Sequence, residues 1–379
     1  MKSINKFIFA GLVFSIILFV TGCSPSTGSN PTSGNDNGNE INNQSKGPFT
    51  VECSELEAFF DKLEKTTRDA PYEIIVSHPV EGVLGPVLKA NAYNKKFYKL
   101  SFINYEEDSS INYSAYTEMD SIRLNNSLIS LVIPKTVEGT ETDTYSFLYG
   151  CGNLETIEVE EGNPTFSSKN GVLYREDETT LVCYPKEKKD SEFTMPETVK
   201  YVYSGAFAHN DYITKVYINP AVQYLDGWIF PGCSALKEFK TDSTVSNKKF
   251  IDIDGVLFND VYKKLISYPP NKEVKNYTVP DGIKTIDYYA FYECQKLEKV
   301  VISSQVTEIN DCAFQYCDNL VSVVIPVSVT FIGEEAFTSC DSLTNIYYRG
   351  TQEEWNAIEK EENIFYFMDT PVITYNYSN

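Results

Sequence analysis

The sequence predicts an α+β repeat solenoid built mostly from short β-strands. Cys294, Cys317 and Cys340 lie 23 residues apart, each inside the frame Ala-Phe-x-x-Cys-x-x-Leu. A constant period of this length indicates one supersecondary unit stacked on copies of itself. Each unit covers the apolar face of its neighbour and leaves its other sides free. Because solenoids offer long open faces more often than closed pockets, this architecture favours binding over catalysis.

The composition fits a folded body with a strong acidic bias. The chain has 379 residues, 42% of them hydrophobic, and a formal net charge of −21. Binding to nucleic acid draws on clustered Lys and Arg, so this charge excludes nucleic acid as the expected partner. An anionic bilayer would also repel the body of the protein.

The N-terminal residues 1–22 are typical of an export signal. Lys2 and Lys6 precede the apolar run 7–20, which is too short for a comfortable membrane span. Thr21-Gly22-Cys23 follows this run and resembles the end of a bacterial lipobox. We therefore expect a cleaved lipoprotein signal peptide and a lipid on Cys23 as the only membrane contact. The alternatives are an ordinary secretory signal and an uncleaved anchor helix.

A flexible tether and a small capping unit are expected next. Residues 23–48 are rich in Ser, Asn and Gly and cannot bury enough apolar surface to fold. Residues 49–118 predict a β/α unit that caps the N-terminal end of the solenoid. Its expected elements are a helix over 54–65 with a capping box of Ser54 and Glu57, strands at 72–76 and 96–103, and a helix over 83–93.

The repeats occupy residues 119–350 and follow the frame Leu-x-x-Ile-x-Ile-Pro-x-x-Val, then Ile-x-x-x-Ala-Phe-x-x-Cys. Two copies are lengthened by insertions over about 163–190 and 247–275. Each insertion holds a Gly-Val-Leu-aromatic run and, after a polar charged turn, a second apolar run that ends in Tyr-Pro. This pattern predicts a β-hairpin that projects from the solenoid wall or extends it.

Residues 351–379 predict a helix–strand cap for the C-terminal end. Thr351 is the expected N-cap of the helix, with Glu354 completing a capping box. Trp355 and Ile358 would cover the last repeat, and a strand is expected near 372–375. The alternative role of Trp355 is a platform for stacking sugars.

Alternation along the repeat strands predicts an outward-facing column of side chains. Its members are Glu158, Tyr217, Lys240, Val301, Val324 and Tyr347. The C-terminal half of the column is apolar, which indicates a partner surface. The alternative is a structural ladder that only favours strand formation.

The repeat frame, as it stands from Leu320 to Cys340, resembles that of the BspA-like leucine-rich-repeat surface proteins of bacteria. The two hairpins and the ending from Tyr347 to Ile358 are also similar to that family, so the resemblance covers about residues 120–379. It implies a right-handed leucine-rich-repeat solenoid that is exported and displayed at the surface. Some members resemble adhesins for host matrix proteins or other bacteria. The family has no common ligand residues to transfer.

Two copies depart from this frame. Asn210 takes the place of the cysteine in one copy, and Ile229 takes the place of the alanine in the next. A larger side chain at the alanine position should displace the adjacent turn, so we expect a bend or looser packing there.

The sequence carries no pattern for catalysis or metal binding. His78 and His209 lack partners at ligand spacing, and no nucleophile elbow, P-loop or dinucleotide fingerprint is present. The segment 252–255 resembles the start of a calcium loop, but Lys263 stands where a bidentate Glu is needed. We therefore expect a hairpin turn there, and no catalytic residue, metal or cofactor in the protein.

Five cysteines share one repeat position: Cys151, Cys233, Cys294, Cys317 and Cys340. Export permits disulfides, and stacking of repeats could bring neighbouring cysteines within bonding distance. Buried cysteine also packs well as a small apolar residue. We favour free, buried thiols.

Together these features predict a lipid-anchored extracytoplasmic binding protein, on the outer membrane and cell surface. Its expected partner is a protein or glycan of the host matrix or of a neighbouring bacterial surface. The alternative is a periplasmic or envelope scaffolding lipoprotein without a host ligand.

Overall fold

The structure, a computed structural model, describes residues 46–67, 69–77, 96, 98–103, 127–133, 135, 152–225, 227–246, 248–261, 263–361 and 363–378. All of these belong to one compact unit of the chain. The predicted signal peptide, the lipid attachment site Cys23 and the predicted helix over 83–93 lie outside the described residues. Most of the predicted tether lies outside them as well.

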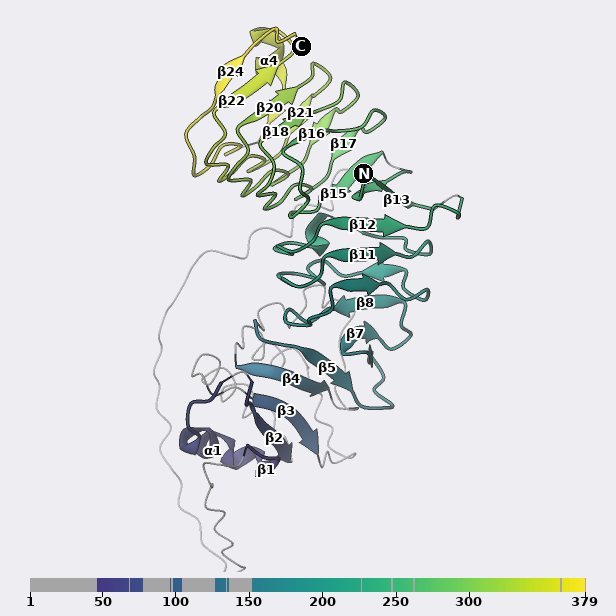
Figure 1. The fold of residues 1–379 in the computed structure, drawn as a ribbon, viewed down its shortest axis with the longest axis vertical. Helices are drawn as coiled ribbons and strands as arrows, with labels where there is room; N and C mark the ends of the chain where they lie inside the picture. Colours follow the sequence, from purple (N-terminus) through teal and green to yellow (C-terminus); the bar gives the residue numbers. More distant parts are fainter. Residues whose placement is uncertain are drawn as a thin grey trace, which may run out of the picture. The chain divides into compact units, whose positions relative to one another are not determined.

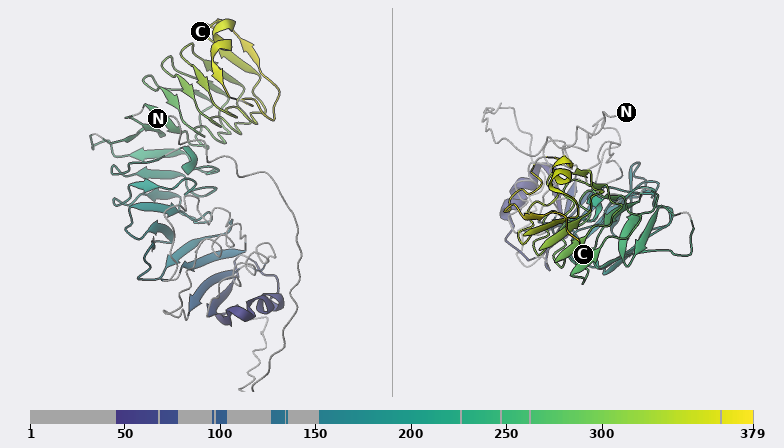
Figure 2. Two further views of the ribbon diagram at one scale, coloured as in Figure 1. Left: turned by 180° about the vertical axis from the view of Figure 1, so that it is seen from behind. Right: turned by 90° about the horizontal axis from the view of Figure 1, so that it is seen from above.

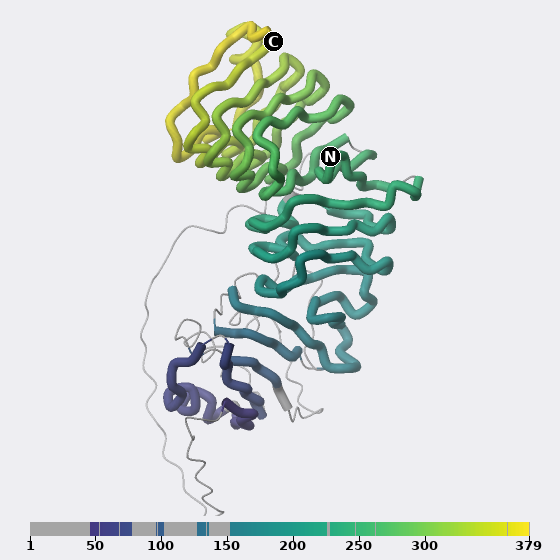
Figure 3. Tube along the Cα trace, viewed as in Figure 1, coloured from purple at the N-terminus to yellow at the C-terminus, as the bar shows by residue number. Residues whose placement is uncertain are grey.

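Successive coils of the chain stack in sequence order, and each adds a strand to a parallel sheet (Figures 1 and 3). One set of sheets holds the first strand of each coil. It comprises β1-β2-β3-β4-β5, β9-β11-β12 and β16-β18-β20-β22-β24. Their bounds are β1 Phe49–Glu52, β2 Tyr72–Ser77, β3 Tyr98–Ile103, β4 Leu128–Ile133, β5 Thr156–Val159, β9 Glu192–Thr194, β11 Lys215–Ile218, β12 Glu238–Thr241, β16 Asn276–Thr278, β18 Lys299–Val301, β20 Ser322–Ile325, β22 Asn345–Tyr348 and β24 Val372–Thr374.

The second set of sheets lies on another side of the coils (Figure 2). It holds the four-residue strands of the two insertions together with strands of only two residues. These sheets are β6-β7-β8-β10 and β13-β14-β15-β17-β19-β21-β23. Their bounds are β6 Phe166–Lys169, β7 Val172–Arg175, β8 Thr180–Cys183, β10 Tyr201–Val202, β13 Phe250–Ile253, β14 Val256–Asn259, β15 Lys264–Ser267, β17 Thr285–Ile286, β19 Glu308–Ile309, β21 Phe331–Ile332 and β23 Glu359–Lys360. The predicted repeat solenoid is therefore the observed fold.

The two insertions form the antiparallel meanders β6-β7-β8 and β13-β14-β15. Each opens with a two-residue turn, Asn170-Gly171 or Asp254-Gly255, in which both residues have positive φ. Asn-Gly and Asp-Gly are the preferred sequences for this type I′ turn. The expected hairpin turn at 252–255 is thus present. β8 and β15 then pair in parallel with β10 and β17, so the meanders extend the sheets of the solenoid.

Side chains alternate across the meanders and join different parts of the core. Val172 and Tyr174 belong to the middle core cluster, whereas Leu173 belongs to the N-terminal one. In the second meander, Val256 packs into the C-terminal cluster and Leu257 into the middle one. Alternation places successive side chains on opposite faces of a strand, so the middle strands β7 and β14 are buried on both faces. The first meander therefore lies between the N-terminal and middle core clusters, and the second lies between the middle and C-terminal clusters.

Aromatic rings stack along the axis of the repeats. Phe291 and Phe314 lie 4.6 Å apart between ring centroids, and Phe314 and Phe337 lie 5.1 Å apart, each pair nearly parallel. Tyr184 and Tyr268, which end the meanders, occupy the same place and stack on the next phenylalanine at 5.0 and 5.2 Å. Each meander therefore also completes a coil, which the sequence pattern did not reveal.

The described cysteines of the repeat position, Cys233, Cys294, Cys317 and Cys340, are free and buried. The thiols of Cys233, Cys317 and Cys340 donate hydrogen bonds to the carbonyls of Phe207, Phe291 and Phe314 at 3.0, 2.9 and 2.9 Å. Each thiol thus bonds to the coil before its own. Free cysteines in the described part of the chain are Cys183, Cys233, Cys294, Cys312, Cys317 and Cys340; Cys151 lies outside it.

The looser packing expected at Asn210 and Ile229 is not observed. Both side chains are fully buried. The Asn210 amide nitrogen donates to three carbonyls of the meander end, those of Pro185, Lys186 and Lys188, each at 3.0 Å. The longer Asn side chain therefore ties the turn to the meander, where a thiol would make one bond.

The two described α-helices are short and differ in their caps. α1, Leu56–Lys62, follows a 3-10 turn at Cys53–Glu55, and its N-cap is Glu55 without a side-chain bond. The predicted capping box of Ser54 and Glu57 is therefore wrong, because the 3-10 turn moves the helix start. α4, Gln352–Ala357, carries the expected box of Thr351 and Glu354. Trp355 is 5% exposed, and its ring lies 5.3 Å from that of Tyr348 on the last repeat strand. This position agrees with the expected role of Trp355 as a residue that covers the last repeat.

Candidate partner-binding surfaces

The predicted outward column does not form one continuous ladder. Glu158 lies on β5, Tyr217 and Lys240 lie on β11 and β12, and the remaining three residues lie on β18, β20 and β22. These strands belong to three separate sheets. The meanders interrupt the parallel pairing between them, so the column is divided into three ladders.

The ladder on β9-β11-β12 carries charges that neutralise one another. Lys215 forms ion pairs with Glu192 at 3.3 Å and with Glu238 at 2.9 Å. Lys240 adds a third pair to Glu238 at 2.9 Å. The hydrogen bond with Glu238 raises the pKa of Lys215, and the same bond lowers the pKa of the Glu238 carboxyl. Exposed ion pairs of this kind contribute little to stability. Because these charges pair with one another, none of them is left to pair with a binding partner.

The ladder on β16-β18-β20-β22-β24 is mostly apolar. In register across these strands lie Thr278, Val301, Val324, Tyr347 and Thr374. Val301 and Tyr347 are partly exposed, and the Tyr347 ring stacks on Tyr377 at 4.5 Å.

Val324 is not available for contact with a partner, although the sequence suggested that it would be, because its side chain is only 1% exposed. It faces away from the core cluster that holds its neighbours Val323 and Ile325. Side chains about 4.8 Å away on each adjacent strand flank it, and Val301 and Tyr347 are those neighbours. The accessible part of this strip is therefore Val301, Tyr347 and Tyr377, which we call the tyrosine–valine strip.

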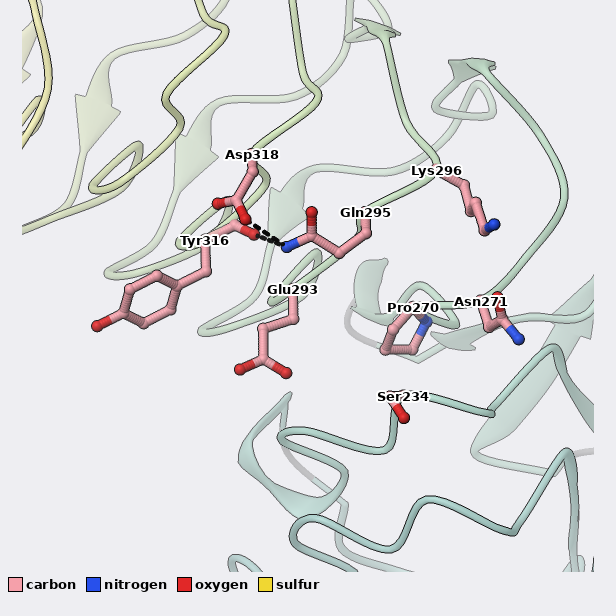
Figure 4. Close-up of a pocket in the computed structure, with 8 residues that line it drawn as sticks. All are labelled: Ser234, Pro270, Asn271, Glu293, Gln295, Lys296, Tyr316 and Asp318. Carbon is pink, nitrogen blue, oxygen red and sulfur yellow. Dashed lines mark hydrogen bonds between the residues drawn. The ribbon is translucent and has the colours of Figure 1, made fainter.

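A depression of about 240 Å³ lies among the turns that precede β12, β16, β18 and β20 (Figure 4). We call this part of the surface the turn side. The lining of the depression comes from four turns and comprises Ser234, Pro270, Asn271, Glu293, Gln295, Lys296, Tyr316 and Asp318. The Gln295 amide donates to the Asp318 carboxylate at 3.1 Å and to the Tyr316 carbonyl at 2.7 Å. No repeat motif marks these residues, because they occupy variable positions of different copies.

Burial raises the pKa of the Glu293 carboxyl in this depression, and the charges of Asp211 and Asp318 raise it further. A hydrogen bond from Tyr292 opposes the shift. Figure 4 shows the Lys296 side chain directed away from Glu293, toward Asn271. The depression is therefore acidic.

A row of aromatic side chains adjoins the depression. The Trp228 ring lies 4.2 Å from Tyr289 and 5.4 Å from Tyr292, and Tyr292 lies 5.6 Å from Tyr316. We call these four residues the aromatic row. Trp228 directly precedes Ile229, the residue that replaces the alanine of the frame in that copy, so this departure lies next to the surface.

Within the described ranges, no three His, Cys, Asp or Glu side chains are grouped so that they could hold a metal ion. His209 is partly buried, and burial lowers its pKa, with a further contribution from Lys186. In the same part of the chain, no helix is both long and apolar enough to cross a bilayer.

Comparison with known families gives one match. The family described as "BspA type Leucine rich repeat region" matches in 6 copies over residues 183–258 and 268–372. A search of curated proteins found no match.

Solved structures of similar proteins come from several bacteria. A leucine-rich repeat protein from Eubacterium ventriosum is 24% identical, over 65% of this chain and 60% of that one, with a TM-score of 0.37. The pneumococcal vaccine antigen PcpA is 18% identical, over 86% of this chain and 62% of that one, with a TM-score of 0.38. A leucine rich cell surface protein from Faecalibacterium prausnitzii is 22% identical, over 62% and 83% of the two chains, with a TM-score of 0.31. The matched part spans about three fifths of the length of the first two proteins.

Proposed function

The chain belongs to the BspA-type leucine-rich repeat family, and we propose that it is a lipid-anchored binding protein of the bacterial surface. Its partner would be a protein or glycan of a host matrix or of a neighbouring cell. Binding would rest on surface complementarity along a face of the solenoid, with no chemical step. This family is typically one of non-enzymatic scaffolds, which agrees with that mechanism.

The tyrosine–valine strip is the observation that carries this proposal. It is a partly exposed apolar strip on a parallel sheet, whereas the ladder on β9-β11-β12 is polar and internally paired. Covering apolar surface with a partner gains about 25 cal/mol per Å². Tyr347 and Tyr377 are also of the residue type that is enriched where interfaces bind most strongly.

A binding assay with the lipid-free body tests the strip. We expect Val301→Asp with Tyr347→Asp to weaken binding to its host-matrix or glycan ligand at least ten-fold, because two charges would be desolvated at the contact. Val324 is left unchanged, since an Asp there would be buried and would unfold the sheet. Val261→Asp controls for the addition of a charge at an exposed apolar position away from the strip, because Val261 is 63% exposed in the loop of the second meander. Equal binding by the double variant and the control, with unchanged circular dichroism, would reject this face.

Anchoring is tested on cells. The lipobox supports a lipid on Cys23, so a palmitate analogue fed to the producing bacterium should label the protein, and Cys23→Ala should abolish the label. Protease added to intact cells should clip a surface-displayed protein. A lipid-labelled protein that protease spares would instead be a periplasmic or envelope scaffold.

A further inference from the structure

The aromatic row joins turns that lie far apart in the sequence. Trp228 belongs to the coil before the second meander, Tyr289 and Tyr292 to a coil after it, and Tyr316 to the next coil. Tyr316 is 40% exposed, and the other three side chains are partly exposed. The row therefore presents aromatic surface to solvent where the coils before and after the meander meet.

The depression at the end of the row holds two carboxylates that form no ion pair with Lys296, the one cation in its lining. Neither Glu293 nor Asp318 forms an ion pair with any described residue. Asp211, whose carboxylate accepts from the Ser234 hydroxyl at 2.5 Å, lies close enough to act on Glu293 as well. The Glu293 carboxyl is thus close enough to two further carboxylates, those of Asp211 and Asp318, for their charges to act on it, and Tyr316 lines the same depression.

We propose that the aromatic row and this depression together bind an arginine side chain of a basic peptide segment. A guanidinium offers five N–H donors in a plane, which can bond to Glu293 and Asp318. Its flat face can stack on a tyrosine or tryptophan ring, which contributes about 0.5–2 kcal/mol. The volume of about 240 Å³ admits one such side chain and little more.

Charge and chemistry favour this occupant over others. The net charge of −21 attracts basic segments and repels acidic ones. A cation in the depression would also offset the cost of keeping Glu293 ionised in a partly buried place. The site is separate from the tyrosine–valine strip, so the loss of one leaves the other untouched.

The test uses the mature chain and a fluorescein-labelled peptide in which three arginines alternate with glycine. Binding is followed by fluorescence anisotropy at physiological salt and by the emission of Trp228. The chain has two tryptophans, and the other, Trp355, is only 5% exposed. The same peptide with citrulline in place of arginine keeps the shape and removes the charge.

We expect Glu293→Gln with Asp318→Asn to weaken the arginine peptide at least ten-fold, and Tyr316→Ala to weaken it several-fold. The matched control is Asp341→Asn with Glu353→Gln, which removes the same charge from exposed positions. Asp341 occupies the place of Asp318 in the next repeat. The control should bind within two-fold of the natural protein, and the citrulline peptide should bind at least ten-fold more weakly.

Equal losses in the two double variants would reduce the effect to bulk charge and overturn the proposal. Equal binding of the arginine and citrulline peptides, or no binding of either, would overturn it as well. The tyrosine–valine strip would stand in each of these cases, because its own variants leave this depression intact.

Discussion

At the scale of residues, two equivalent tyrosines differ in what their hydroxyls meet. Tyr184 ends the first meander, and its hydroxyl donates to the Asp190 carboxylate at 3.4 Å. Tyr268 holds the same place in the second meander, but its hydroxyl is buried without a hydrogen-bond partner, as is that of Tyr277. Leaving a buried hydroxyl unbonded costs about 1–3 kcal/mol.

Removing that hydroxyl should therefore stabilise the protein. We expect Tyr268→Phe to raise the free energy of unfolding by about 1 kcal/mol, because the ring stack on Phe291 is kept. Tyr184→Phe, which loses its bond to Asp190, should be neutral or destabilising. Urea titrations of both variants make the comparison, and a greater loss from Tyr268→Phe than from Tyr184→Phe would contradict the assignment.

The buried cysteines should be silent toward thiol reagents in the folded protein. Burial raises the pKa of the Cys317 thiol well above its ordinary value, and the hydrogen bond with Cys317 and burial raise that of Cys340. The reactive thiolate therefore does not form in the folded state at neutral or mildly alkaline pH. Peptide mapping after labelling at pH 8 should find both residues unmodified without denaturant and modified in urea. Silence in urea as well would mean that disulfides link them.

At the scale of elements, the meanders depend on turns that only glycine accommodates. Gly171 has φ +76, and a Cβ at that position would lie 2.5 Å from the Thr156 hydroxyl. Gly162 also has positive φ, +88, but a Cβ there would meet nothing within 4 Å.

Alanine at these two positions should separate the effect of a steric clash on stability from the effect of backbone strain. We expect Gly171→Ala to lower the free energy of unfolding by about 1–2 kcal/mol more than Gly162→Ala does. Thermal unfolding of the two variants gives the difference. Equal losses would show that β7 does not approach Thr156 as closely as the structure has it.

The period of the sequence was enough to predict the coils, because every repeat meets the same neighbours. Phe291, Phe314 and Phe337 stack as their spacing required. The roles of Tyr184 and Tyr268 were not predictable, since they follow an insertion that breaks the spacing. The outward column was predicted by alternation, but alternation does not tell that the meanders divide it or that Val324 is buried.

The turn-side surface shows a second reason why binding surfaces could not be predicted from the sequence. Its lining residues sit at variable positions of separate copies, and only stacking brings them together. The sequence marked this surface only through Ile229, which departs from the frame next to Trp228. A constant frame predicts the core, whereas a binding surface arises where copies differ.

At the scale of the whole molecule, the three core clusters meet at the two meanders. Strands β7 and β14 contribute side chains to both neighbouring clusters, so the interior continues across each meander. The faces of the sheets and the turn side are then the parts left for partners. The account rests on this burial of the meanders within the stack.

Hydrogen exchange followed by mass spectrometry tests that burial most directly. The amides of β7, β8, β14 and β15 should exchange as slowly as those of β18 and β20, because strands buried on both faces open only with the core. The loop around Val261, which is exposed, should exchange within seconds and serves as the internal reference. If the meander strands exchange as fast as that loop, they lie outside the core, and the single continuous solenoid is contradicted.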